Sequence, residues 1–289
     1  MALSFNRTEI TIAGLTAHYF QLNDEGDDAH FYPGSGLPVG VYGPLLERLS
    51  SHYQLSSLAI RASWRDARLP GPQIDWRIYA KDLIAFLEAR YAKPIVAIAH
   101  SQGAHATLVA AVMRPDLFKQ LILVDPVAVL KRDEVLISWI PYFVKRYFEP
   151  FKSVRLRQST WDSVEQYYEY LSTHRAYKRI PPDKLRILAE YSLEATDNGS
   201  FRFVYPVAWE MASSALPRSL KQYFKQVTVP YTVIMGKPSL FSSQKVRDSW
   251  SRVMKSTMVV NEQYGHLIPL EAPEYCCEQI IHNVRAQGS

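Results

Sequence analysis

The sequence has few cysteines and no long hydrophobic run, and both absences exclude classes of protein. Only Cys276 and Cys277 are cysteines, and two neighbours in one helix cannot reach disulfide geometry. A disulfide-stapled scaffold is therefore excluded, and a reducing compartment is favoured. No stretch approaches the roughly 18 consecutive apolar residues of a membrane span, and the N-terminus shows no secretory signal pattern. We expect a cytoplasmic protein with no transmembrane segment.

Glycine is also scarce, with 12 residues against 18 prolines, while 47% of the chain is hydrophobic and 21% is charged. This composition is globular, and 289 residues suffice for one large domain with an insertion. No nucleic-acid-binding motif is present, and no histidine pair has metal-ligand spacing. We therefore expect a monomer or homodimer with no nucleic-acid partner, no metal and no cofactor.

The positive charge of the chain is concentrated in one stretch. The formal net charge is +5, and residues 131–186 contain twelve Lys or Arg against seven Asp or Glu, which accounts for the whole excess. Such a run is usually a solvated face. Anionic substrates or a lipid interface are the alternatives, and the sequence leaves them open.

Strand-like and helix-like segments alternate along most of the chain. After an N-terminal β-hairpin, short and mostly apolar strands are expected at residues 55–60, 95–99, 121–124, 231–235 and 258–260. Helical periodicity is expected at residues 76–91, 102–113, 243–254 and 271–284. Apolar strands alternating with helices predict a mostly parallel sheet covered on both faces, a three-layer α/β/α fold.

Residues 131–215 interrupt this alternation. The segment is helix-like and holds sixteen of the 36 aromatic residues. These aromatics either pack an added helical layer or roof a pocket for an apolar substrate. The sequence predicts a core made of residues 1–130 and 216–289, with residues 131–215 inserted as a helical cap.

Residues 99–103, Ala-His-Ser-Gln-Gly, lie between an apolar strand and an apolar helix. This strand-turn-helix pattern is typical of a nucleophile elbow, in which Ser101 projects from a sharp turn above the sheet. Small residues are needed on both sides of the turn, and Ala99 and Gly103 provide them. Gln102 would be the first residue of the helix, and its backbone N–H would point at a developing oxyanion. Leu37, in the glycine-rich turn at residues 33–38, is the candidate for the second donor.

A histidine follows the last expected strand. His266 stands on a loop before the final helix, where a general base must lie to reach a serine on the central strand. The other histidines fit no such role. The sequence therefore predicts a pair of Ser101 as nucleophile and His266 as base.

The chain resembles the α/β-hydrolase superfamily, specifically its capped, esterase-like members. The resemblance rests on the motif at residues 99–103, on Gly36-Leu37, and on Gly265-His266 with the Pro-Leu-Glu-Ala-Pro that follows. The resemblance covers residues 5–130 and 216–285. It implies the α/β-hydrolase fold and a nucleophile, acid and histidine in that chain order.

The chain departs from that pattern at the acid. Relatives usually carry it a few residues after the strand expected at 231–235, but residues 236–239 contain no carboxylate. A minority, including pancreatic-type lipases, place it at the end of the preceding strand, which is Asp125 here. We take Asp125 as the acid, with Asp248 or the loss of any functional acid as alternatives.

A second departure is at residues 61–65, where relatives often have Arg-Gly-His-Gly. Trp64 in this loop either lines the pocket or packs in the core.

The sequence predicts a serine hydrolase that cleaves a small-molecule carboxylic ester with an apolar acyl or alcohol group. Ser101, His266 and Asp125 would be catalytic, with Leu37 and Gln102 as oxyanion donors. Two alternatives remain: a cofactor-free dioxygenase or lyase using the His-Asp pair, and a non-catalytic binding protein that lost its acid. A dehalogenase is disfavoured, because that chemistry needs a carboxylate in place of Ser101.

Overall fold

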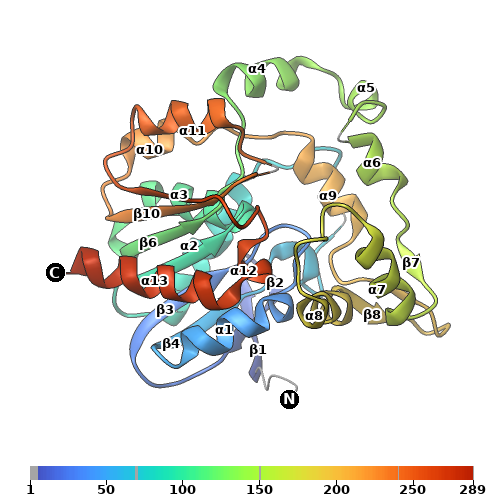
Figure 1. Cartoon of the computed structure of the whole chain (residues 1–289), viewed down its shortest axis with the longest axis horizontal. Coiled ribbons are helices and arrows are strands. Elements are labelled where there is room, and N and C mark those ends of the chain that lie inside the picture. Colours follow the sequence, from blue (N-terminus) through green and yellow to red (C-terminus); the bar gives the residue numbers. More distant parts are fainter. Residues whose placement is uncertain (1–5, 69–70, 150, 240, 289) are drawn as a thin grey trace.

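The structure is a computed structural model, and it describes residues 6–68, 71–149, 151–239 and 241–288 (Figure 1). Its centre is an eight-stranded sheet with the strand order β1-β2-β4-β3-β5-β6-β10-β11. The strands are β1 (Asn6–Ile12), β2 (Leu15–Gln21), β3 (Asp27–Tyr32), β4 (Tyr53–Leu58), β5 (Ile95–His100), β6 (Phe118–Val124), β10 (Tyr231–Gly236) and β11 (Met258–Asn261).

Strands β4, β3, β5, β6, β10 and β11 run parallel to one another, and only the β1–β2 and β2–β4 pairs are antiparallel. The central strands are apolar because helices cover both faces of the sheet, and every residue of β5 and of β10 is buried. The expected mostly parallel sheet is confirmed.

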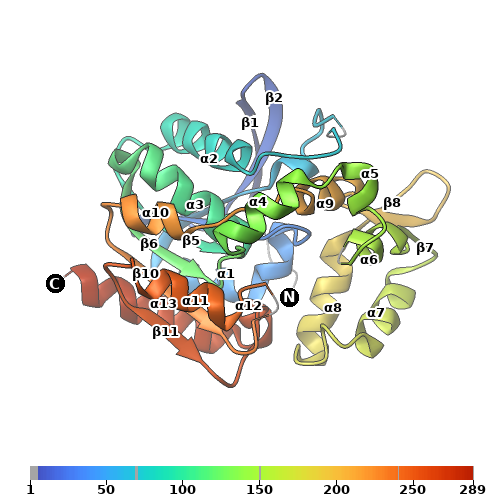
Figure 2. The same ribbon diagram turned by 90° about the horizontal axis from the view of Figure 1, so that it is seen from above.

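Helices form the two outer layers around the sheet (Figure 2). They are α1 (Gly43–Ser50), α2 (Arg77–Arg90), α3 (Gln102–Met113), α10 (Lys221–Gln226), α11 (Gln244–Ser251), α12 (Ile268–Glu271) and α13 (Pro273–Gly288). Helix α3 contacts α2 and α10 on one side of the sheet, and α1 contacts α13 on the other. Short 3₁₀ turns occur at Val39–Tyr42, Arg61–Ser63 and Pro115–Leu117. The three-layer α/β/α arrangement is therefore confirmed.

Residues 131–215 were predicted to be helical, and the structure adds a small sheet to the helices. The helices are α4 (Lys131–Trp139), α5 (Tyr142–Lys145), α6 (Phe151–Leu156), α7 (Val164–Thr173), α8 (Pro182–Ser192) and α9 (Val207–Ser214). The strands are β7 (Thr160–Trp161), β8 (Leu193–Ala195) and β9 (Phe201–Phe203), which pair antiparallel in the order β7-β9-β8. Strands of two or three residues are too short to show alternation, so the sequence could not reveal them.

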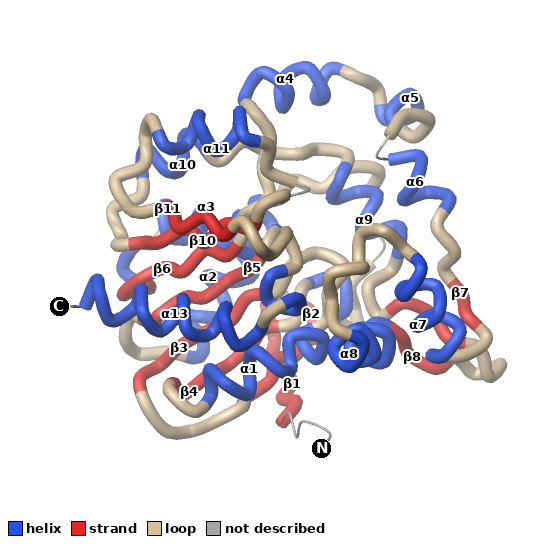
Figure 3. Tube along the Cα trace, viewed as in Figure 1, coloured by secondary structure: helices blue, strands red, loops and turns tan. Residues whose placement is uncertain are grey.

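Figure 3 shows the strands of the large sheet on one side of the molecule and helices α7 and α8 on the other. Hydrogen bonds connect helix α9 to the segment before α2. The Ile74 N–H donates to the Ala212 carbonyl at 3.0 Å, and the Trp76 indole N–H donates to the Ser213 carbonyl at 2.7 Å. Within the described ranges, no helix has the length and apolar character needed to cross a bilayer. The division into a core and a cap at residues 131 and 215 stays a prediction.

Candidate active site

Ser101 lies at the bend between β5 and α3, and its backbone is held in a strained conformation. Its φ of 55° and ψ of −119° lie in a region that side chains rarely adopt. The turn fits only because Gly103 has no side chain, since a Cβ there would lie 2.3 Å from the carbonyl oxygen of Tyr32. This crowding is the physical reason for the small residue two positions after the serine.

The imidazole of His266 lies between Ser101 and Asp125. Its Nε2 is 3.1 Å from the Ser101 hydroxyl, and its Nδ1 is 2.7 Å from Asp125 Oδ1. All three side chains are buried. With the proton on Nδ1 held toward Asp125, Nε2 is free to accept the serine proton. The structure therefore brings together the three residues that the sequence predicted as nucleophile, base and acid.

Asp125 follows β6 and has a φ of 41°. Its Oδ1 also accepts a bond from the Ser239 hydroxyl at 2.6 Å, and its Oδ2 accepts one from the Gly236 N–H at 2.8 Å. The segment that lacks a carboxylate therefore donates hydrogen bonds to Asp125. The alternative acid, Asp248, is exposed on α11 and bonds Gln244 at 2.7 Å. Geometry thus favours Asp125 over Asp248.

Two contacts position the loop that carries His266. The buried carboxylate of Glu271 accepts the Gly265 N–H at 2.7 Å. The imidazole Nε2 of His100 lies 2.9 Å from the His266 carbonyl oxygen, where it donates its proton. Because a backbone held on both sides fixes the direction of the imidazole, these contacts orient the predicted base.

His100 belongs to a longer hydrogen-bonded chain that sequence reasoning missed. Its Nδ1 is 2.8 Å from the hydroxyl of Tyr42, and that hydroxyl accepts the N–H of Gly34 at 2.9 Å. Burial, and next the neighbouring His266, lower the pKa of His100 to about 3, which keeps its ring neutral. A neutral ring can accept from Tyr42 and donate to His266 at once. The chain thus connects the glycine-rich turn to the loop of the base.

The two predicted oxyanion donors have different outcomes. Gln102 is the first residue of α3, where a backbone N–H has no partner inside the helix and is free for an anion. The N–H of Leu37 instead donates to the Gly34 carbonyl at 3.4 Å and closes a turn in which Gly36 has a φ of 75°. Leu37 is therefore a poor candidate, because its N–H already has a partner.

Ser35 replaces Leu37 as the candidate for the second donor. The preceding residue, Gly34, lies against the nucleophile, since a Cβ on it would be 3.0 Å from Ser101 Cβ. In the described part of the chain, the Ser35 N–H has no hydrogen-bond partner, while its side chain donates to the Tyr205 hydroxyl at 2.9 Å. The prediction from the sequence relied on the second glycine of the turn, Gly36, whereas in the structure the first glycine, Gly34, lies against Ser101.

Side chains at the edge of the site are partly apolar. The ring of Phe241 packs edge-on against His266 with centroids 4.6 Å apart, and it is 53% exposed. Glu210 on α9 lies near the glycine-rich turn, 3.9 Å from where a Cβ of Gly36 would be. Glu210 is paired with Arg157 at 2.5 Å, so the two charges neutralise each other.

Trp64 is buried, its indole N–H donates to the Ala59 carbonyl at 2.7 Å, and the guanidinium of Arg61 lies 4.9 Å above its ring. It packs in the core, although one edge lines a surface hollow.

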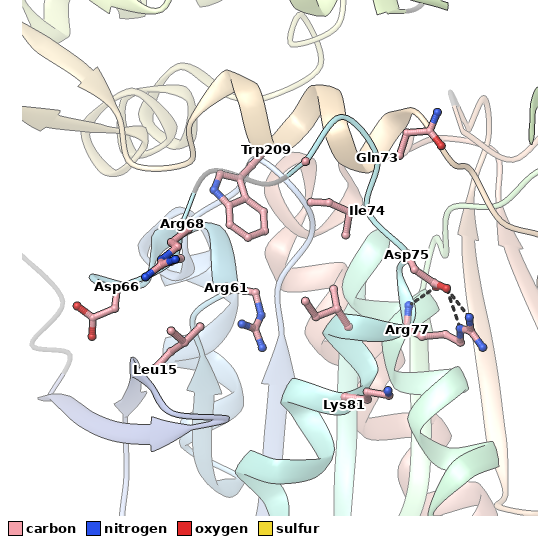
Figure 4. Close-up of a pocket in the computed structure, with 13 residues that line it drawn as sticks. Leu15, Arg61, Asp66, Arg68, Gln73, Ile74, Asp75, Arg77, Lys81 and Trp209 are labelled. Carbon is pink, nitrogen blue, oxygen red and sulfur yellow. Dashed lines mark hydrogen bonds and ion pairs between the residues drawn. The ribbon is translucent and has the colours of Figure 1, made fainter. Parts of the chain in front are cut away.

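A separate hollow of about 670 Å³ lies beside α2 and is shown in Figure 4. Arg77 in its wall pairs with Asp75, and Arg61 pairs with Asp82. Its lining does not include Ser101, Asp125 or His266. Among the described side chains, no three His, Cys, Asp or Glu converge in a way that could hold a metal ion.

The chain is similar to two proteins whose names specify hydrolases, and to one of them along most of its length. A 2-(acetamidomethylene)succinate hydrolase of Mesorhizobium japonicum is 22% identical over 258 residues, 89% of this chain and 87% of that protein. An (E)-2-((N-methylformamido)methylene)succinate hydrolase of Acinetobacter baylyi is 27% identical over 135 residues, 42% of this chain and 49% of that protein.

A solved structure of an E-2-(acetamidomethylene)succinate hydrolase superposes with a TM-score of 0.80 at 22% identity, covering 97% of this chain and 99% of that one. This likeness confirms the fold. The sequence pattern of the alpha/beta hydrolase family matches residues 29–279, so the chain belongs to the alpha/beta hydrolase family.

Proposed function

We propose that this hydrolase cleaves a carboxylic ester through an acyl-enzyme formed on Ser101. The observation that carries the proposal is the continuous hydrogen-bonded line from Asp125 through His266 to the Ser101 hydroxyl, with contacts of 2.7 and 3.1 Å. Such a line is the requirement for activating a serine, because a free hydroxyl is a weak nucleophile.

In the first half of the reaction, the Ser101 Oγ bonds to the ester carbonyl carbon as its proton passes to His266 Nε2. Negative charge develops on the carbonyl oxygen, and the N–H groups of Gln102 and Ser35 stabilise it. The ester C–O bond then breaks, and the alcohol leaves with the proton from His266. Asp125 holds the imidazole and stabilises its charged form.

In the second half, water gives a proton to His266 Nε2 as its oxygen attacks the acyl carbon. The Ser101 Oγ–carbon bond breaks, Oγ takes back the proton, and the carboxylic acid is released. The same N–H groups serve both tetrahedral intermediates. Residues 131–215 would act as the cap over this site.

Two features favour an uncharged, apolar substrate. The ring of Phe241 beside His266 offers an apolar surface. Arg157 near the glycine-rich turn is already paired with Glu210, so it does not offer an unpaired cation to a substrate carboxylate. A second candidate is hydrolysis of a carboxylate-bearing substrate, favoured by the two relatives whose names specify substituted succinates.

The test is a panel of p-nitrophenyl esters of increasing acyl length, with the native protein and Ser101→Ala. We expect the substitution to lower kcat by at least about 10⁴-fold. Ser249→Ala, on α11, where the hydroxyl donates to the Val246 carbonyl of its own helix at 2.7 Å, is the matched control and should keep the native rate. The chain-length optimum would measure the apolar pocket.

Labelling with a fluorophosphonate separates the remaining alternatives. We expect stoichiometric modification of the native protein and none of Ser101→Ala. A native protein that neither turns over esters nor reacts with the probe would contradict the proposal and favour the binding-protein interpretation. Ester hydrolysis that survives Ser101→Ala would contradict the acyl-enzyme and indicate that the His-Asp pair takes a proton directly from water.

A further inference from the structure

We propose that α4, α5 and α6 form a surface that docks on an anionic lipid bilayer. Eleven large hydrophobic residues of the described chain are exposed, and eight of them lie between residues 135 and 156. The most exposed are Leu136, Trp139, Phe143, Tyr147, Phe148 and Leu156, at 61–82%. We call this cluster the α4–α6 surface. Its position is independent of the ester chemistry proposed above.

Helix α4 has no buried residue, so its apolar side chains do not belong to the core. Figures 1 and 2 show α4 and α5 running along the outside of the molecule. A soluble surface usually carries single exposed hydrophobic residues, whereas a contiguous cluster marks an interaction site. The α4–α6 surface therefore requires a partner that covers apolar side chains.

The aromatic composition of the surface suits the boundary between lipid and water. Trp139 is 82% exposed, and Tyr147 is 61% exposed. Tryptophan and tyrosine are enriched at membrane interfaces, where the ring enters the acyl region and the polar atom remains hydrated. Phe143 and Phe148 add purely apolar anchors beside them.

The segment that carries these aromatics is positively charged, although Lys145 is buried and donates to the Ala215 carbonyl. Residues 131–157 contain seven Lys or Arg against three Asp or Glu, a net charge of +4. The guanidinium carbons of Arg146 and Arg155 lie 5.7 and 5.4 Å from the Tyr147 ring centroid. Over the part of the chain that the structure describes, Arg146, Arg155 and Lys152 have no acidic partner. Lys152 is exposed and the two arginines are half-buried, so these cations can meet anionic headgroups at the surface.

Charge also distinguishes a bilayer from a second copy of the chain. A two-fold interface would bring the same patch, with its unpaired cations, against itself. Phosphatidylserine headgroups instead neutralise those cations while the acyl region covers the aromatics. Helix α4 begins six residues after Asp125. A bilayer docked on this surface would therefore contact the segment that follows Asp125 at the carboxyl edge of the sheet.

The test is flotation of the full chain with vesicles of phosphatidylcholine alone or with phosphatidylserine added. We expect binding to the anionic vesicles only, weakened by raised salt. Combined substitution of Arg146, Lys152 and Arg155 by Gln should lower binding by about a hundredfold. A matched variant replaces Lys93, Lys245 and Arg252 by Gln, which changes the net charge equally at exposed positions elsewhere, and it should bind as the native chain does.

A second variant, W139A/F143A, should abolish binding with its circular dichroism spectrum unchanged. Ser101→Ala should bind vesicles as the native chain does, which separates this proposal from the proposed hydrolysis. Absence of flotation with anionic vesicles would overturn it, as would binding unaffected by the cation substitutions. A concentration-dependent dimer that W139A/F143A abolishes, with no vesicle binding, would assign the surface to a second copy instead.

Discussion

The imidazole of His100 donates from Nε2 to the carbonyl oxygen of His266 at 2.9 Å, which ties the residue before the nucleophile to the loop of the predicted base. On its other side, His100 meets the Tyr42 hydroxyl, which also accepts the Gly34 N–H. The nucleophile elbow, the loop of the base and the glycine-rich turn are therefore held by one buried chain of hydrogen bonds.

Replacing Tyr42 by Phe would remove only the hydroxyl in the middle of this chain. We expect kcat to fall about tenfold with little change in KM, because small displacements of the oxyanion turn and the base slow the chemical step. Ester kinetics measure the split between the two constants.

Tyr91→Phe is the control for this prediction. Its hydroxyl is bonded at 2.6 Å to Ser56 on β4, which β3 separates from β5 and Ser101, so stability should fall while kcat is kept. Equal effects of the two substitutions on kcat would show that this chain of hydrogen bonds does not position the site.

Asp125→Asn tests the assignment of the acid. Loss of the carboxylate should leave His266 in the wrong tautomer and lower kcat by about 10³- to 10⁴-fold. Asp248→Asn, on the exposed face of α11, should keep the native rate. Similar small losses in both variants would show that neither residue is the acid.

Gly36 and Gly14 form a matched pair for the glycine-rich turn. Both have a φ of 75°, and a Cβ would meet nothing closer than 3.9 Å at either. Alanine at either position should cost about 1–2 kcal/mol of stability through its left-handed backbone. Only Gly36→Ala should also slow ester hydrolysis, because only that turn carries the proposed Ser35 donor. Urea unfolding and kcat distinguish the two effects, and an equal rate loss in Gly14→Ala would contradict the assignment.

Residues with strong local signals were predictable from the sequence. The bounds of α3 agree with the expected residues 102–113 because its start is set by the elbow and its end by Arg114-Pro115. Ser101 and His266 could be identified because each follows an apolar strand at the carboxyl edge of a parallel sheet. Asp125 follows from the same rule, because it directly follows a strand of that sheet while residues 236–239 contain no carboxylate.

Features that depend on tertiary contacts were not predictable. Choosing Ser35 over Leu37 required knowing which glycine contacts Ser101, and spacing alone does not contain that information. The bonds of His100 join residues 58 and 166 positions apart in the chain. The exposure of the apolar side chains of α4 was also not predictable, because an apolar segment in a sequence is usually assigned to the core.

Four buried histidines predict how stability depends on pH. Burial lowers the pKa of His30 and His100 to about 3 and that of His18 and His105 to about 4, from an ordinary value of 6.5. Below pH 6.5 the unfolded chain binds protons at these rings and the folded chain does not, so stability falls as pH falls. At pH 5 each ring contributes a loss of up to about 2 kcal/mol.

Urea unfolding between pH 8 and pH 5 measures this loss. His30→Gln should reduce the slope of stability against pH, since one of the four rings is gone. His52→Gln is the control, because His52 is exposed, and it should leave the slope unchanged. A slope that His30→Gln does not alter would show that this ring takes up its proton in the folded state.

The ion pair of Arg157 and Glu210 should decide the charge preference of the site. The native protein should hydrolyse p-nitrophenyl butyrate faster than the p-nitrophenyl hemisuccinate of equal acyl length, because the guanidinium near the glycine-rich turn is occupied. Glu210→Gln would free it for a substrate carboxylate and should raise the relative kcat/KM of the hemisuccinate about tenfold. Glu194→Gln frees the exposed Arg202 of the same segment and should leave the ratio unchanged. A native preference for the hemisuccinate would instead support a substrate like those of the succinate hydrolases, since the pair would then have to open when such a substrate binds.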